Sequence, residues 1–230
     1  MAVRKRASAM TKTEQQRFVD TITQLNLNAF YGGFVAIHGD MMHRMHSSMG
    51  FVGGQRFLPW HRLYLHKLEQ AMQAIDSKAF IPYWRWTKDR AIPKWMLGFK
   101  PTVSVPGQGL ITVVRNPQPP AQLPTQARIT GILALTTYTD FTTDLESRPH
   151  NRVHMWVNGT MSSIPTAPAD PLFWMHHAMI DRIWSMWQAK PANSAKGPIL
   201  SGNDRILDPW TETVNQVKSI SVLGYSYGPG

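Results

Sequence analysis

The 230-residue sequence contains no cysteine and few charged side chains, and each absence excludes a class of protein. Without cysteine there are no disulfide bonds, no thiolate-bound zinc or iron–sulfur centres and no thiol nucleophile. No hydrophobic run approaches the ~18 residues that span a membrane, and the opening MAVRKRASAMTKTEQQ has no apolar segment behind its charges, so no signal peptide is visible. We therefore expect a soluble chain without a membrane partner, in a compartment that the sequence leaves open.

Basic residues outnumber acidic ones: 24 Lys and Arg stand against 14 Asp and Glu, which gives a formal net charge of +10. An excess of this size raises nucleic acid as a possible partner. The densest cluster, however, is Arg4-Lys5-Arg6 near the N-terminus, and no basic helix or stacking sheet follows it. We therefore expect a solvated basic surface and no nucleic-acid partner.

The hydrophobic content of 43% is enough for one sizeable core, and we expect residues 1–230 to form a single domain. Thr11 stands three residues before a glutamate, as in a capping box, and Asp170-Pro171 has the pattern of an N-cap and the first helical residue. Pro59 likewise suits the first turn of a helix. Hydrophobic periodicity then predicts helices over 12–29, 31–46, 59–76, 149–157 and 171–188.

The stretch 88–149 has a different composition from the predicted helices. It carries many Pro and Gly residues and short β-branched pieces such as 110–115, so we interpret it as a long irregular excursion rather than a second domain. The chain beyond residue 189 is predicted to be mostly loop. The predicted fold is mainly α: a four-helix bundle with long irregular loops and a few short strands, with a metal inside because histidines lie on two helix pairs.

Histidines fall into two groups, five between residues 38 and 66 and four between 150 and 177. His150 and His154 are four residues apart, so on a helix their imidazoles lie on one side and can coordinate one metal ion together. His176 and His177 are adjacent and point about 100° apart, so at most one of them joins that pair comfortably. The other is expected to support the site or to pack.

In the first group, the side chains of His38 and His46 point in directions about 80° apart around the axis if one helix continues through both. The His43 side chain would point about 140° away from that of His38. His38 and His46 are therefore the favoured pair. His61 opens the next predicted helix and completes a second set of three imidazoles. His66 faces about 140° away from His61 and is expected at the surface.

Two sets of three imidazoles restrict the metal. Dinuclear hydrolases and di-iron bundles commonly include bridging Asp or Glu ligands, and none is interleaved with these histidines at helical spacing. Copper or zinc is therefore favoured. Copper suits dioxygen chemistry and zinc suits hydrolysis, and spacing alone leaves both open.

Specific motifs surround these histidines, and through them the sequence resembles the tyrosinase family, the type-3 dicopper proteins that include catechol oxidases and hemocyanins. The motifs are RFLPWHR at 56–62, HNRVH at 150–154 and DPLFWMHHA at 170–178, with Asp181-Arg182 and the terminal Tyr225-Ser226-Tyr227. The resemblance spans nearly the whole chain. It implies two copper ions, the first held by His38, His46 and His61 and the second by His150, His154 and His177.

The sequence departs from the family pattern at the middle ligand of the first copper. In many members that histidine lies nine residues before the one in Pro-Trp-His, a position that is Val52 here. The nearest upstream histidine is His46, followed by two serines as in some fungal members. The resemblance therefore implies a six-residue insertion and His46 as the ligand, with His43 as the rival. The thioether that some relatives form between this ligand and a cysteine is absent.

The resemblance also implies roles for residues around the metals. Glu146 and Asn151 match the pair thought to hold the water that deprotonates monophenols, although Glu146 alternatively caps the short helix. Ile164, Met155 and Phe173 are expected at the substrate pocket, and Phe173 also against a ligand histidine. Asp181 is expected to orient His177 or to pair with Arg62. Arg4 is expected to stack on the motif of Tyr225 and Tyr227.

The function that the resemblance implies is a dicopper oxidase, a tyrosinase that uses dioxygen to hydroxylate monophenols and to oxidise o-diphenols to o-quinones. The alternatives are a catechol or o-aminophenol oxidase without monophenolase activity, and an oxygen carrier of the hemocyanin type. Expected partners are small phenols and dioxygen, with a separate copper-loading helper protein as a further possibility, since no lid domain accompanies the motifs.

Overall fold

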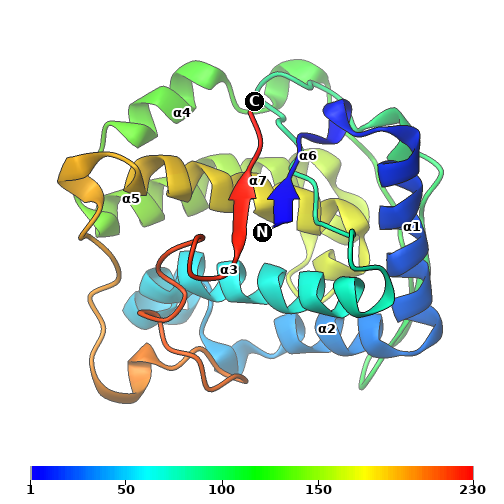
Figure 1. Cartoon of the computed structure of the whole chain (residues 1–230), viewed down its shortest axis with the longest axis horizontal. Helices are drawn as coiled ribbons and strands as arrows, with labels where there is room; N and C mark the ends of the chain where they lie inside the picture. The colour runs from blue at the N-terminus through cyan, green and yellow to red at the C-terminus, as the bar shows by residue number, and fades with distance from the viewer. Residues whose placement is uncertain (1, 230) are drawn as a thin grey trace.

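A computed structural model describes residues 2–229, and within them the fold is mainly helical with long loops and a few short strands, as predicted. The α-helices α2, α3, α6 and α7 carry His38, His61, His154 and His177, and α7 packs against α3 (Figure 1). The helices are α1 Lys12–Leu27, α2 Phe30–Gly39, α3 Gly50–Ile75, α4 Gln126–Leu133, α5 Tyr138–Leu145, α6 Asn151–Val157 and α7 Pro171–Gln188. No helix of the described residues is long and apolar enough to cross a membrane.

Two of the predicted helix starts are confirmed by their caps. At the start of α1, Thr11 accepts a hydrogen bond from the backbone of Glu14, and the Glu14 side chain accepts one from the backbone of Thr11. At the start of α7, the Asp170 side chain accepts from the backbone N–H of Leu172. The same carboxylate binds Arg115 through two contacts of 2.7 Å, which fastens the preceding excursion to α7.

The prediction of one helix over 31–46 was wrong, because α2 ends at Gly39. Asp40 caps a short 3-10 turn over Met41–His43, and Arg44 then adopts a left-handed conformation with φ 46°. A left-handed residue cannot continue a right-handed helix. His46 therefore lies in an extended loop between α2 and α3, and the helical angle used to pair it with His38 does not apply.

The predicted start of the next helix at Pro59 was also wrong, because α3 begins at Gly50 and Pro59 lies inside it. Proline has no N–H to donate, so it leaves the carbonyl oxygen of Gln55, four residues earlier, without its helical partner. The Tyr138 hydroxyl on α5 donates to that oxygen at 3.0 Å. This contact from a distant element satisfies the oxygen and lets the helix run through the proline.

The excursion 88–149 contains more regular structure than predicted. Strands β2 Thr102–Val105 and β3 Gly109–Thr112 pair as an antiparallel hairpin, which accounts for part of the β-branched sequence. Helices α4 and α5 follow and were missed. The predicted helix over 149–157 is shorter in the structure, because α6 begins at Asn151. The residues before it, Glu146–His150, form a π-helical turn.

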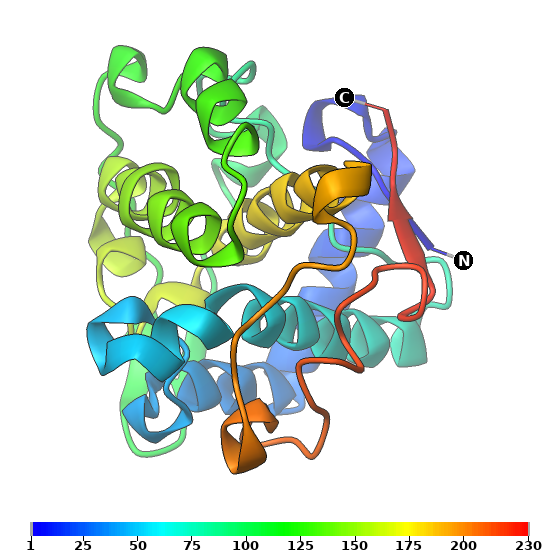
Figure 2. The ribbon, with the colours of Figure 1, turned by 90° about the vertical axis from the view of Figure 1, so that its left-hand side faces the viewer.

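The two ends of the described chain meet beside α7. Strand β1 Ala2–Arg4 pairs in parallel with β4 Tyr225–Tyr227, and both ends lie close together in Figure 1. Between α7 and β4 the chain is mostly loop, as predicted, and it crosses α3 (Figure 2). The Trp60 indole donates to the Asp208 carbonyl oxygen at 2.6 Å, and Arg62 donates to the Lys218 carbonyl oxygen at 2.5 Å. These contacts hold the C-terminal loop against the helix that carries His61.

Candidate metal centre and substrate pocket

The first histidine cluster combines His38 near the end of α2, His46 in the loop and His61 in α3. The Nε2 atom of His38 lies 3.3 Å from the Nε2 atoms of both His46 and His61. All three side chains are buried. The structure therefore brings together the three histidines that the sequence predicted for the first copper.

The position of His46 depends on a close approach between its loop and α3. The backbone N–H of Met49 donates to the His46 carbonyl oxygen at 2.9 Å, which closes a short turn just before the helix. A Cβ atom added to Gly53 would lie 2.0 Å from the same oxygen. Glycine at position 53 is therefore what allows the His46 backbone to rest on the first turn of α3.

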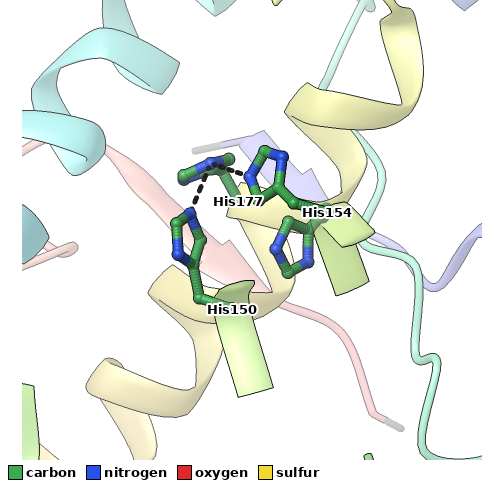
Figure 3. A group of neighbouring side chains, drawn as sticks. His150, His154 and His177 are labelled. Atoms are coloured by element: carbon green, nitrogen blue, oxygen red, sulfur yellow. Dashed lines mark hydrogen bonds between the residues drawn. The ribbon is translucent and has the colours of Figure 1, made fainter. Parts of the chain in front are cut away.

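The second cluster combines His150 and His154 with His177 of α7, and Figure 3 shows the first two rings turned toward the third. The Nε2 atom of His177 lies 3.3 Å from the Nε2 atoms of His150 and His154. His150 ends the π-helical turn and His154 lies one turn later in α6. The predicted i and i+4 pair thus shares one side even though the helix begins later than expected.

Fixed hydrogen-bond acceptors set the tautomers of most of these imidazoles. The Nδ1 atoms of His38, His61 and His154 donate to main-chain oxygens of Ile164, Phe57 and Met161 at 2.7–2.8 Å. His46 Nδ1 lies 3.3 Å from a Glu146 oxygen, and His150 Nδ1 lies 2.9 Å from Asn151 Oδ1. When Nδ1 carries the proton, Nε2 presents a lone pair. In each cluster these rings therefore turn unprotonated nitrogens toward the centre of that cluster.

The nitrogen spacing fits a metal ion in each cluster. Metal–imidazole bonds of ~2.0–2.1 Å in a tetrahedral arrangement place ligand nitrogens about 3.3 Å apart, which is the separation observed between the Nε2 atoms. Lone pairs facing one another at this distance repel unless a cation lies between them. Three neutral imidazoles without a carboxylate or thiolate suit copper or zinc.

Burial keeps five of the six imidazoles in the neutral form that binds metal. Desolvation, together with neighbouring imidazoles, holds the pKa values of His38, His61, His150 and His177 well below the usual range. Desolvation lowers the pKa of His154 to about 4. At neutral pH, protons therefore do not compete with a metal ion for these nitrogens.

The other histidines lie outside the two triads or at their edge. His43 stacks on Trp60 and lies 3.7 Å from Asp40, so the structure brings His46 and not His43 into the first cluster. His66 is half-buried and stacks on Tyr225. His176 is close to the second triad, but its Nδ1 accepts a hydrogen bond from the Trp86 indole at 3.1 Å. That contact turns the ring toward Trp86.

The two triads are neighbours. The rings of His61 and His177 stack with centroids 4.4 Å apart and an angle of 15° between planes. Phe173 packs on His177 at 4.1 Å and meets His38 edge-on at 4.9 Å, and its side chain is fully buried. Phe173 therefore lies against the histidines, as expected, but it does not line the cavity in front of them.

A cavity of about 330 Å³ opens onto both triads. Glu146 is buried, and its Oε1 atom accepts from the backbone of Ser47 at 2.9 Å. Its Oε2 atom has no partner within the described residues. Asn151 and the half-exposed Met155, both on α6, line the cavity together with Ile164. The residues in the lining are His38, His46, Ser47, Ser48, Glu146, His150, Asn151, His154, Met155, Met161, Ser162, Ile164 and Ala167.

Asp181 lies beside Arg62 rather than His177. Its two oxygens accept from Arg62 at 2.6 Å and from Tyr225 and Tyr227 at 2.6 Å each. Burial by itself raises the pKa of the Asp181 carboxyl, and the charges of Arg62 and Arg4 outweigh it, so the pKa is lowered. His177 Nδ1 has no partner within the described residues.

Arg4 completes this group, with its guanidinium 3.7 Å above the Tyr225 ring. The predicted stacking of Arg4 is therefore present, and it ties the two ends of the described chain to α7.

The contact between Glu146 and His46 was not predicted. The two residues are 100 positions apart, and the link runs through a loop that the sequence assigned to a helix. The Trp86 donor to His176 was also missed, because Trp86 lies in the stretch without periodic pattern before the hairpin. A carboxylate in reach of a ligand imidazole is a common outer contact of metal sites, so Glu146 four residues before His150 was the one available signal.

Comparisons with known proteins agree with this geometry. A model of the common central domain of tyrosinase matches residues 28–117 and 107–190, which include both triads. Tyrosinase from Streptomyces glaucescens is 31% identical and aligns over 93% of this chain and 94% of its own length. Grixazone synthase from Streptomyces griseus is 28% identical over 82% of this chain and 84% of its length. A functional unit of octopus hemocyanin superimposes with a TM-score of 0.81 at 25% identity, covering 100% of this chain and 68% of that one.

Proposed function

The chain belongs to the tyrosinase family of dicopper oxidases, and from that premise we propose that it uses dioxygen to hydroxylate monophenols and to oxidise o-diphenols to o-quinones. The cofactor of the family is a pair of copper ions. The observation that carries the proposal is that two triads of imidazoles meet at one cavity, next to a buried carboxylate oxygen without a partner within the described residues. When bound, the copper pair supplies the activation of dioxygen and accepts the electrons of the phenol.

In this proposal His38, His46 and His61 hold one copper ion, and His150, His154 and His177 hold the other. The main-chain oxygens that accept from the Nδ1 atoms keep each ring aimed at its metal. Glu146 does the same for His46, and Asn151 for His150. His176 stays outside the ligand set because Trp86 donates to its Nδ1 atom.

The phenolic proton is removed by a water held between Glu146 and Asn151. Glu146 Oε1 is occupied by Ser47 and His46, whereas the buried Oε2 has no partner within the described residues, and Glu146 is one of the residues that line the cavity. A water that donates to Oε2 takes the proton from the substrate hydroxyl and passes a proton to the carboxylate, which leaves a phenolate. A phenolate binds a cationic metal far better than a phenol does, so this transfer prepares a monophenol for hydroxylation.

The substrate ring lies in this cavity, whose lining includes Met155 and Ile164. Ile164 is held because its carbonyl oxygen accepts from His38 at 2.8 Å. This contact fixes the Ile164 backbone beside His38 of the first triad. Met155 has three rotatable bonds and adapts to rings of different substitution.

We also propose that residues 1–230 act as one catalytic domain. The Asp181 network supports this, because it joins β1, α3, α7 and β4 through buried charged contacts. The hydrophobic core likewise runs through all of the helices around the triads without interruption.

Oxygen consumption tests the proposed function, measured with a monophenol and its matching catechol on the copper-loaded protein and on Glu146→Gln. We expect the variant to lose monophenol turnover by about 100-fold or more, to keep catechol oxidation within about tenfold, and to retain two copper ions. Asp20→Asn, a remote surface carboxylate on α1, is the control and should change neither rate.

Two outcomes would overturn parts of the proposal. Equal loss of both rates together with lost copper would mean that Glu146 only positions His46. Turnover of the catechol alone by the unmodified protein would make it a catechol oxidase, and reversible oxygen binding without turnover of either phenol would make it an oxygen carrier.

A further inference from the structure

A second hollow adjoins the cavity in front of the triads. It has a volume of about 630 Å³ and is lined by the 121–125 loop and by residues between Arg128 and Met155. Asn151 and Met155 line both spaces, so the two adjoin at the first turn of α6. We call the second hollow the arginine groove, after Arg128, Arg148 and Arg152 in its lining.

The arginine groove has a positive charge that its surroundings do not cancel. Three guanidinium groups line it and no carboxylate does. Asp144, just outside, pairs with both Arg128 and Arg148 at once. One negative charge therefore faces three positive ones. The neighbouring cavity has no arginine or lysine in its lining, and its one acid is Glu146.

Arg152 is the guanidinium most available to a ligand. It directly follows Asn151, and it is exposed. Its Nε atom donates to the Gln122 carbonyl oxygen at 2.9 Å, which fixes the direction of the side chain. It forms no ion pair with any carboxylate of residues 2–229. An oriented guanidinium without a counter-ion is well suited to a carboxylate, which it binds through two parallel hydrogen bonds.

The loop to which Arg152 is hydrogen-bonded is held in place before any ligand binds. The Arg90 guanidinium donates to the carbonyl oxygens of Pro120, Leu123 and Pro124 at 2.7–2.9 Å. The Trp156 indole donates to the Pro119 carbonyl oxygen at 3.0 Å. Four hydrogen bonds thus fix the loop that carries Gln122. A preformed wall lowers the ordering cost of binding.

We propose that the arginine groove binds the carboxylate of phenolic acids while their ring occupies the cavity in front of the triads. The inference rests on the proposed function and names its substrate class: phenols whose side chain carries a carboxylate and no compensating ammonium group. Arg152 receives the carboxylate, and Arg148 adds long-range attraction. A side chain with at least a few bonds between ring and carboxylate is needed, because Asn151 and Met155 separate the two spaces.

Kinetics with matched substrates test the inference. Hydroxyphenylpropanoate and its uncharged amide differ in charge and not in ring. We expect Arg152→Gln to lower kcat/KM for the acid by about threefold to tenfold, through KM rather than kcat, and the amide to change by less than about twofold. Arg152→Lys should restore part of the loss, and the preference for the acid should shrink as salt is added.

Lys12→Gln removes the same unit of charge from the start of α1, which lines neither space, and is the matched control. It should leave the ratio of acid to amide unchanged. An equal fall of that ratio in Lys12→Gln would show that net charge and not the groove selects the substrate. An unchanged ratio in Arg152→Gln would refute the inference.

Binding to the copper-free protein separates this inference from the proposed function. Phenylpropanoate has no hydroxyl group to oxidise, and its affinity can be measured by calorimetry without turnover. We expect it to bind more tightly than its amide, and Arg152→Gln to remove the difference. If the unmodified protein proves inactive toward phenols yet shows this preference, carboxylate binding in the arginine groove is supported and the proposed phenol oxidation is refuted. Equal affinity for acid and amide would refute the groove.

Discussion

Replacing Gly53 by alanine tests how the first triad is built. The new Cβ atom would lie 2.0 Å from the His46 carbonyl oxygen, whereas real contacts of this kind are essentially never below 3.0 Å. The loop must therefore retreat by about 1 Å, and metal–ligand distances tolerate only about 0.2 Å. We expect Gly53→Ala to bind one copper ion per chain in place of two and to lose about 1–3 kcal/mol of unfolding free energy from overpacking.

Gly54→Ala is the matched control, because it adds the same methyl group to the next residue of the same helix. Its Cβ atom would lie 3.5 Å from the Ser47 Cβ atom, an ordinary contact. We expect this variant to keep both copper ions and to gain up to about 1 kcal/mol, as glycine-to-alanine changes inside helices do. Copper content by atomic absorption and urea unfolding of each protein give the answer. Two copper ions in Gly53→Ala at unchanged stability would refute the reasoning.

Three further predictions follow from the geometry. His46→Ala should halve the bound copper, and His43→Ala should leave it unchanged. Metal analysis that shows the reverse would make His43 the ligand of the first copper ion in place of His46. The copper-free protein should lose stability as pH falls from 6.5 toward 4, because the folded pKa of His154 is lowered to about 4 and the unfolded chain then binds more protons. This imidazole alone contributes on the order of 3 kcal/mol, so urea midpoints that do not change over this range would contradict it. Asp181→Asn should lower the free energy of unfolding by about 3–5 kcal/mol, because the buried Arg62 and Arg4 lose their shared carboxylate. A decrease below about 1 kcal/mol would show that the ion pairs of Asp181 are not what holds β4 in place.

Local signals in the sequence predicted the parts of the fold that local contacts determine. The capping box at Thr11 and the N-cap at Asp170 depend on residues within three positions, and both helices begin there. The pair His150 and His154 depends on one helical turn, and the structure places both rings against His177.

The errors arose where a distant contact decides the outcome. Pro59 lies inside α3 because the Tyr138 hydroxyl, from another helix, satisfies the Gln55 carbonyl oxygen. Helix α5 itself has a β-branched, threonine-rich sequence with low helical propensity, and tertiary packing overrides that propensity. The position of Glu146, four residues before His150, indicated only that its carboxylate lies near a ligand histidine, and the contact with the distant His46 depends on the tertiary fold.

Oxygen uptake by the copper-loaded protein, with a monophenol and with its catechol, tests the central claim most directly, because both triads and the cavity between them are needed for either reaction. The copper-free protein is the reference. We predict uptake with both substrates, each yielding an o-quinone that absorbs in the visible range, and none without copper. A protein that holds two copper ions and consumes no oxygen with either phenol would contradict the account.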